Sequence, residues 1–225
     1  MKIKLFVAAA ATLLASSAMA QSAFEGAYGQ LGIGYDQNSL SSSGFLADGT
    51  PTSAPGANGG SFAGVVGLGY NFAAGKQFLL GLGADYGVIP SSAFNGSNSN
   101  GTTQTTISNR YNIFVTPGYA IDKNKLAYLK AGFSSQSVKV TDQSNVGSNG
   151  QTVGNGSANG YVLGLGYKQM ITSGFYGFGE VNYYSYSGAS FGSQRLTNNP
   201  TLTTVSGYSP TTSAYQFLIG AGYKF

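Results

Sequence analysis

Apolar and polar residues alternate through the last eleven residues of the chain. Every second residue counted back from Phe225 is apolar or aromatic, and the residues between are mostly polar or small. A period of two predicts a β-strand with one apolar face, because successive side chains of a strand point to opposite sides. Aromatic residues stand at both ends of this face, with aliphatic residues between them. The face consists of Tyr215, Phe217, Ile219, Ala221, Tyr223 and Phe225.

Seven earlier segments show the same alternation. They lie at residues 25–36, 61–72, 78–88, 106–119, 126–138, 160–170 and 175–186.

Each segment has the roughly 9–11 residues that a tilted strand needs to cross a bilayer. The frame of 175–186 is the least regular and is fixed by placing Glu180 on the polar face. The frame of 106–119 puts Ile107 and Tyr111 on the apolar face. It also puts Asn109 there, a polar residue that interrupts the apolar pattern.

The ionisable residues of these strands fall on the polar faces, except Glu25 at the start of the first strand. A charge at mid-bilayer on the lipid side costs roughly 2–4 kcal/mol, which accounts for this sorting. The residues on the polar faces are Asp36, Asp85, Arg110, Lys130, Lys168, Glu180 and Lys224.

The links between the strands alternate strictly between short and long. The short ones are 73–77, 120–125 and 171–174, and the long ones are 37–60, 89–105, 139–159 and 187–210. This pattern is typical of an antiparallel barrel with turns at one end and loops at the other. A soluble barrel that binds ligands inside would reverse the faces. The sequence therefore predicts an all-β fold, an eight-stranded antiparallel up-and-down transmembrane β-barrel with four long extracellular loops and both termini in the periplasm.

Residues 1–20 have the features of a cleaved signal peptide. Lys2 and Lys4 precede an apolar run that is too short to cross a bilayer as a helix, and Ala18 and Ala20 form a cleavage site. We expect residues 21–225 to form the barrel as one domain, in the bacterial outer membrane.

Composition narrows the chemistry. Only 8% of the residues are charged, and the chain has no His and no Cys, which excludes disulfides and removes the commonest metal ligand and general base. Residues 21–225 carry nine basic and seven acidic residues (11 − 2 = 9, since Lys2 and Lys4 are removed), which is no argument for nucleic-acid binding. We expect no enzymatic activity, no cofactor and no metal.

One polar constellation points into the predicted lumen, namely Asp85, Arg110, Lys130 and Glu180. These residues would either form a selective pore or satisfy one another as a structural network. Inward aromatic residues favour the network, since they obstruct water. The repeated pattern Gly-apolar-Gly-Tyr, as in Gly164 to Tyr167, is explained by inward glycines that relieve crowding in a narrow barrel.

The segments 128–133 (YLKAGF) and 180–184 (EVNYY) are similar to mid-barrel segments of the OmpA/OmpX-type family of small outer-membrane β-barrel proteins, which includes opacity proteins. The chain departs from OmpA in ending at the barrel. Enzymes among small outer-membrane barrels use a His, which this chain lacks. The resemblance implies a terminal Phe read by the assembly machinery, with Phe217, Ile219, Tyr223 and Phe225 as the signal.

The same resemblance implies the partners. These are outer-membrane lipid and lipopolysaccharide, the barrel-assembly machinery, periplasmic chaperones, and host or environmental surfaces that meet the loops. It leaves two functions open, a surface-interaction protein with a filled lumen or a narrow OmpW-like channel for small solutes.

Overall fold

The computed structural model describes residues 22–54, 56–98, 101–143, 149–188, 191, 194–198, 201–207 and 209–225. The predicted signal peptide, residues 1–20, lies outside the described residues. Within the described part of the chain, no helix has the length and apolar character needed to span a membrane. The strands are β1 (Gly26–Leu40), β2 (Ser43–Ala47), β3 (Thr50–Ala54), β4 (Ala57–Ala73), β5 (Phe78–Gly87), β6 (Ser91–Asn98), β7 (Gly101–Asp122), β8 (Lys125–Gln143), β9 (Asn149–Met170), β10 (Phe175–Tyr186), β11 (Gln194–Asn198), β12 (Thr201–Ser206) and β13 (Thr212–Lys224).

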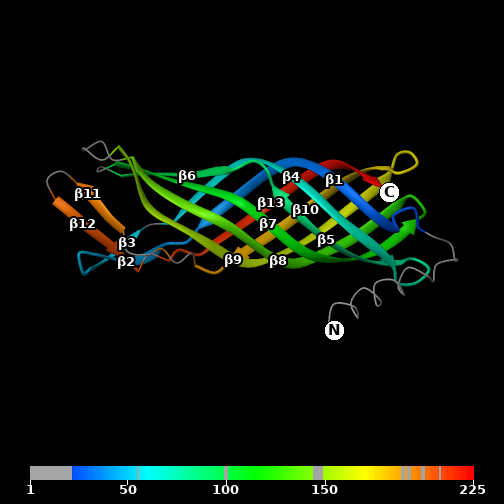
Figure 1. Cartoon of the computed structure of the whole chain (residues 1–225), viewed down its shortest axis with the longest axis horizontal. Coiled ribbons are helices and arrows are strands. Elements are labelled where there is room, and N and C mark those ends of the chain that lie inside the picture. The colour runs from blue at the N-terminus through cyan, green and yellow to red at the C-terminus, as the bar shows by residue number, and fades with distance from the viewer. Residues whose placement is uncertain are drawn as a thin grey trace, which may run out of the picture.

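Eight of these strands form a closed antiparallel barrel (Figure 1). Around the wall the order is β1, β4, β5, β7, β8, β9, β10 and β13. The pairing of β13 with β1, which sets Ile219 opposite Ile33, joins the two ends of the chain. The pairing of β5 with β7, which sets Leu82 opposite Val115, completes the ring. The eight-stranded fold is thus confirmed.

The three short turns lie at the same end of the barrel as Phe225, which we call the terminal end (Figure 1). At the opposite end, the loop end, the strands run much further than the hydrophobic pattern indicated. β7, β8 and β9 have 22, 19 and 22 residues, and β6 pairs with β7 beyond the end of β5. A separate four-stranded sheet there has the order β11, β12, β2, β3.

The four long links were therefore predicted wrongly as loops, since much of their length is strand. The sequence shows no periodic signal there because successive residues such as Gln104, Thr105 and Thr106 are all polar. The β-branched Thr nevertheless suits a pleated strand.

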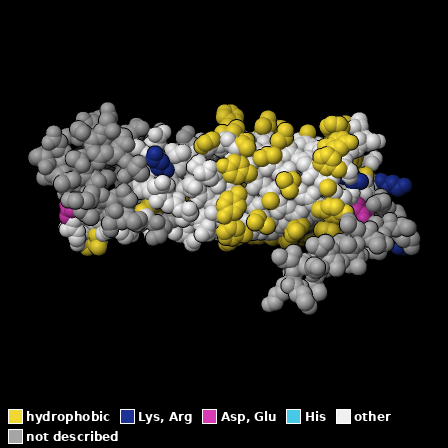
Figure 2. Space-filling model, viewed as in Figure 1, with side chains coloured by type: hydrophobic (Ala, Val, Ile, Leu, Met, Phe, Trp, Pro, Cys, Tyr) yellow, Lys and Arg dark blue, Asp and Glu magenta, His cyan; other side chains and the backbone are white. Residues whose placement is uncertain are grey.

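The outer wall carries an apolar band that is shorter than the strands (Figure 2). Leu31, Ile33 and Leu68 point outward and are 66–67% exposed. Aromatic residues border the band at both edges and pair across strands, as Phe78 does with Tyr119 at the terminal edge, with ring centroids 5.3 Å apart. Tyr35 and Phe62 make a corresponding pair at the other edge, 6.3 Å apart. An apolar band flanked by two belts of aromatic residues is the surface expected of a membrane-spanning barrel.

The frame of β7 shifts at Asn109, so the prediction that Ile107 faces lipid was wrong. Ile107 is buried, whereas Tyr111 is exposed as predicted. The ladder with β8 inserts one extra residue between Ser108 and Tyr111, and Asn109 adopts a φ of 53°. This is a β-bulge, and Asn tolerates the left-handed conformation better than most residues. Asn109, the polar residue that interrupts the apolar pattern, thus marks the position of the bulge.

Inward glycines make room for inward aromatic rings. A Cβ on Gly166 would collide with the ring of Tyr128, and one on Gly222 with the ring of Tyr176. Gly166 and Gly222 belong to the Gly-apolar-Gly-Tyr repeats. The lumen of this eight-stranded barrel is thus filled by large side chains that lie against glycine backbone.

We expect Gly166→Ala to destabilise the barrel by about 1–3 kcal/mol, the usual cost of overpacking. The ring of Tyr128 cannot move away without loss of the 2.7 Å hydrogen bond that its hydroxyl donates to Glu180. The measurement is urea unfolding of the refolded protein in detergent micelles. Gly179→Ala is the matched control, because its Cβ would meet its nearest atom, the carbonyl oxygen of Leu218, at 4.0 Å. Equal stability of the two variants would contradict this account of the glycines.

Candidate functional site

The middle of the lumen holds a buried ion triad on strands β5, β8 and β10. The Lys130 ammonium lies 2.7 Å from Asp85 Oδ2 and 2.9 Å from Glu180 Oε1, and all three side chains are at most 3% exposed. Glu180 also accepts hydrogen bonds of 2.7 Å from the Tyr128 hydroxyl and from Asn182 Nδ2. Each charge in this layer, which we call the Lys130 layer, thus has charged partners and hydrogen bonds that offset its desolvation.

A second charged layer lies nearer the loop end. Arg110 Nη1 is 2.7 Å from Asp36 Oδ2, and the guanidinium also donates to Asn38 Oδ1 at 3.1 Å and to Gln136 Oε1 at 3.2 Å. Its carbon Cζ lies 4.5 Å from the ring centroid of Tyr184. This Arg110 layer closes the lumen with side chains from β1, β7, β8 and β10, and the planar guanidinium suits such multiple hydrogen bonding.

A third layer, the Lys168 layer, lies toward the terminal end. The Lys168 ammonium is 3.9, 4.9 and 5.3 Å from the ring centroids of Tyr28, Tyr176 and Tyr128. Lys168 makes no ion pair with a carboxylate of the described residues, so these cation–π contacts are its main compensation for burial. Its charge balances the excess negative charge of the Lys130 layer, since the three layers hold three basic and three acidic residues.

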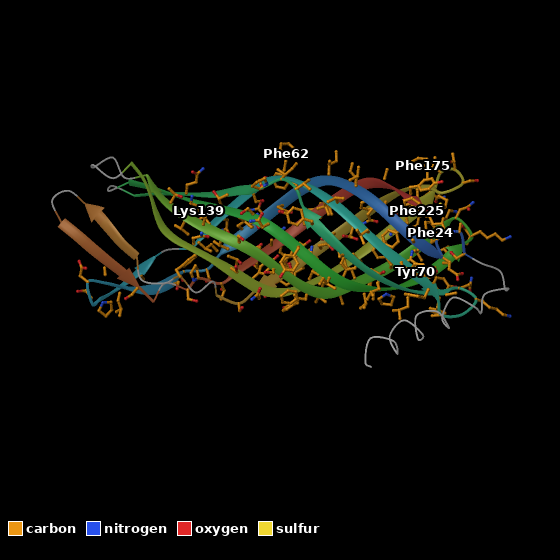
Figure 3. All side chains as sticks on the ribbon, viewed as in Figure 1. Phe24, Phe62, Tyr70, Lys139, Phe175 and Phe225 are labelled. Atoms are coloured by element: carbon orange, nitrogen blue, oxygen red, sulfur yellow. The ribbon has the colours of Figure 1, made fainter. Side chains whose placement is uncertain are left out.

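The segment before β1 caps the lumen at the terminal end. Phe24 is 1% exposed, lies 6.0 Å from the ring of Tyr176, and its carbonyl accepts a 2.8 Å hydrogen bond from Asn71 Nδ2. The amide of Ala23 donates to the carbonyl of Lys123 in the β7–β8 turn at 3.3 Å. Since β8 is the fourth strand from β1 in either direction, this segment crosses the mouth of the barrel. Figure 3 shows Phe24 at the same end as Phe225.

Not all of the predicted constellation comes together. Asp85, Lys130 and Glu180 meet in one layer, whereas Arg110 lies in the neighbouring layer and pairs with Asp36. Sequence reasoning placed Asp36 and Lys168 on the polar face without assigning them to the network.

Phe24 gave no signal in the sequence, because it precedes the first alternating segment and reaches the lumen only by a turn. In that turn the amide of Glu25 donates to the carbonyl of Ser22 at 3.0 Å.

Of the predicted C-terminal signal residues, Phe217, Ile219 and Tyr223 lie on the outward face of β13, and Phe225 follows its last residue. Phe217, Ile219 and Phe225 are more than half exposed, and Tyr223 is 39% exposed. Tyr223 contacts Phe175 at 4.9 Å and Phe225 at 5.2 Å. Through these contacts the end of β13 joins the belt of aromatic residues around the terminal end of the barrel.

The described residues offer no metal centre. No group of three or more His, Cys, Asp or Glu residues that could hold a metal ion is present among them. The lumen chemistry of the described chain is therefore that of ion pairs, hydrogen bonds and aromatic contacts.

Comparison with known proteins supports the architecture. The family model described as "Outer membrane protein beta-barrel domain" matches residues 6–225. No curated protein matches the chain.

Among solved structures, the outer membrane protein OprG from Pseudomonas aeruginosa is 11% identical with a TM-score of 0.53, and the match covers 92% of this chain and 99% of that one. The outer membrane protein AlkL, solved in lipid bilayers, is 13% identical with a TM-score of 0.50, and the match covers 93% and 95%. Ail, the attachment invasion locus protein of Yersinia pestis, is 14% identical with a TM-score of 0.45, and the match covers 89% and 99%.

Proposed function

The chain belongs to the outer membrane protein β-barrel family, and we propose that it is a sealed barrel that presents its loop-end strands to the surroundings of the cell. The observation that carries this proposal is the filling of the lumen. Three layers of charged and aromatic side chains occupy it, and Phe24 caps one mouth. The strands meanwhile run well past the apolar band (Figures 1 and 2). A filled lumen leaves these protruding strands as the part available for contact.

In the orientation we propose, the loop end lies outside the cell and both termini lie in the periplasm, as in barrels with short turns on the periplasmic side. The outward band then contacts outer-membrane lipid, including lipopolysaccharide in the outer leaflet. The chain lacks His and Cys, which supports a non-enzymatic role.

The four long links between the membrane-spanning strands, residues 37–60, 89–105, 139–159 and 187–210, are nearly uncharged. Their ionisable residues are Asp48, Lys139, Asp142 and Arg195, two basic and two acidic. A surface of this kind does not steer a polyanion by long-range attraction. It suits a neutral partner that is bound through hydrogen bonds.

Backbone pairing is the binding mode that the protruding sheet supports best. Within the described residues, its edge strand β11 pairs on one side only, with β12. An unpaired edge exposes N–H and C=O groups to which an extended peptide adds as a further strand. We therefore propose an extended segment of a host or environmental protein as the partner.

The proposal is tested on cells that display the full barrel or a trimmed one, in which short Gly-Ser turns replace 42–55 and 193–207. We expect the trimmed barrel to reach the outer membrane at normal levels and to lose binding to protein-coated surfaces. Binding unchanged by the trimming would contradict the proposal.

A second candidate, a narrow channel for small solutes, is favoured by the polar character of the lumen, which six charged side chains line. Planar-bilayer conductance of the refolded protein separates the two functions. A sealed barrel inserts and stays silent. Steady channels that change in Arg110→Ala or Glu180→Ala would favour the channel.

We further propose that residues 1–20 direct export and are cleaved after Ala20, and that periplasmic chaperones then deliver the chain to the barrel-assembly machinery. In this view Phe217, Ile219, Tyr223 and Phe225 form the signal that the machinery reads, which their outward exposure supports. Deletion of Phe225 should lower the amount of folded barrel in the outer membrane several-fold, measured by heat-modifiable mobility on gels. Deletion of Gly49, in the turn between β2 and β3, is the control, and equal levels of both variants would refute this role for Phe225.

A further inference from the structure

Three buried oxygen atoms lack a hydrogen-bond partner in the described part of the chain, namely Asp36 Oδ1, Asn112 Oδ1 and Asn182 Oδ1. Asp36 and Asn112 share a cavity, to which Asn182 does not contribute. Asp36 is 5% exposed and Asn112 is 2% exposed. The other polar atoms of these side chains are engaged, since Asp36 Oδ2 pairs with Arg110 and Asn112 Nδ2 donates to Asp85. Buried acceptors in folded proteins are nearly always satisfied, so each orphaned oxygen calls for a donor.

Both residues line one small cavity. Its volume is about 20 Å³, and Arg110, Tyr184 and Gln216 contribute to its walls. The cavity lies against the barrel wall where β5 ends at Gly87 and β7 bulges at Asn109. One water molecule needs roughly 10–15 Å³ of such volume, so the cavity has room for a single water-sized species.

The chemistry of the walls selects among such species. An apolar occupant would leave both acceptors unsatisfied. A cation would face the Arg110 guanidinium, and the charge of Asp36 is already compensated by that group at 2.7 Å. Water is neutral and has two hydrogens for two acceptors. It also accepts, and the three hydrogen bonds of Arg110 described above leave N–H groups of the guanidinium for it.

We propose that one buried water molecule occupies this cavity and bridges Asp36 Oδ1 and Asn112 Oδ1. Asn112 donates to Asp85 of the Lys130 layer, and Asp36 belongs to the Arg110 layer. The water therefore joins the two charged layers into one hydrogen-bonded unit. This inference concerns the lumen itself and holds for a silent barrel and for a channel alike.

The test is solution NMR of the ¹⁵N-labelled, refolded mature protein, with water as the probe. A held water gives NOE and ROE cross peaks of opposite sign between the water resonance and the Asn112 side-chain amide. Absence of these cross peaks in the wild type would overturn the proposal. A shift of the Asn112 amide during titration with NaCl or NH₄Cl, absent with the choline salt, would overturn it in favour of a bound cation.

A cavity-filling variant locates the water. Gly87 lines the cavity, and a Cβ there meets Arg110 at an ordinary 3.6 Å, so Gly87→Val places methyl groups in the space without a backbone clash. The cross peaks should disappear in Gly87→Val and persist in Gly179→Val, whose side chain faces outward on β10. Cross peaks that survive in Gly87→Val would place the water elsewhere and refute the bridge. If Gly87→Val does not fold, the wild-type spectra decide alone.

Discussion

Lys130→Met should destabilise the barrel by about 3–5 kcal/mol, the cost of removing one member of a buried ion pair. The substitution removes the ammonium that pairs with both Asp85 and Glu180, so two buried carboxylates then have only the charge of Lys168 to offset them. Lys130 is 2% exposed and bonds to both carboxylates within 2.9 Å, so water cannot replace the ammonium at low cost. Urea unfolding of the refolded protein in lipid vesicles, followed by tyrosine fluorescence and gel mobility, measures the change.

Two controls separate charge from packing. Lys139→Met removes a Lys that lies on the exposed face beyond the apolar band, and it should change stability by no more than about 0.5 kcal/mol (Figure 3). The double variant Asp85→Asn, Lys130→Met leaves two basic residues, Arg110 and Lys168, and two acidic ones, Asp36 and Glu180, and it should recover much of the lost stability. A double variant no more stable than Lys130→Met alone would show that the effect comes from packing rather than charge.

Leu68→Arg should destabilise insertion into lipid by roughly 2–4 kcal/mol, because it places a charge on the lipid-facing wall near the bilayer middle. Leu68 is 66% exposed on the outward face of β4 and pairs across strands with Gly29 and Ala84. The measurement is the yield of folded protein in vesicles as a function of urea concentration.

Ser157→Arg is the matched control for the lipid face. Ser157 is exposed on β9 and pairs with Ser137, beyond the aromatic edge that Tyr161 marks on the same strand. The added Arg there meets water, so folding should be unchanged. Equal loss of folding in both variants would contradict the assignment of the apolar band.

The faces of the strands were readable in the sequence because the bilayer enforces them. Every outward position in the band must be apolar, and every inward charge needs a partner, so the period of two stands out in segments such as 78–88 and 215–225. The strand count and the antiparallel order followed from that period and from the turn lengths. The same logic placed Glu180 and Lys130 inside.

The alternation of apolar and polar residues failed to predict strands outside the bilayer, where the lipid no longer constrains the outer face. Beyond the band the bilayer does not require an apolar outer face, so β2, β3, β6, β11 and β12 gave no periodic signal. At Asn109 one inserted residue reversed the frame, and the hydrogen bond from the Tyr86 hydroxyl to its side chain, at 2.9 Å, is a contact that periodicity does not encode.

The sequence by itself determined which residues face lipid and which face the lumen, since that choice depends on each residue's own hydration free energy. Only the tertiary structure decided which inward groups meet. Arg110 bonds to Asp36, 74 residues earlier, rather than joining Lys130, and Phe24 folds back across the mouth. Such pairings depend on strand register and on the level each side chain reaches within the barrel, which are fixed only when the ring closes.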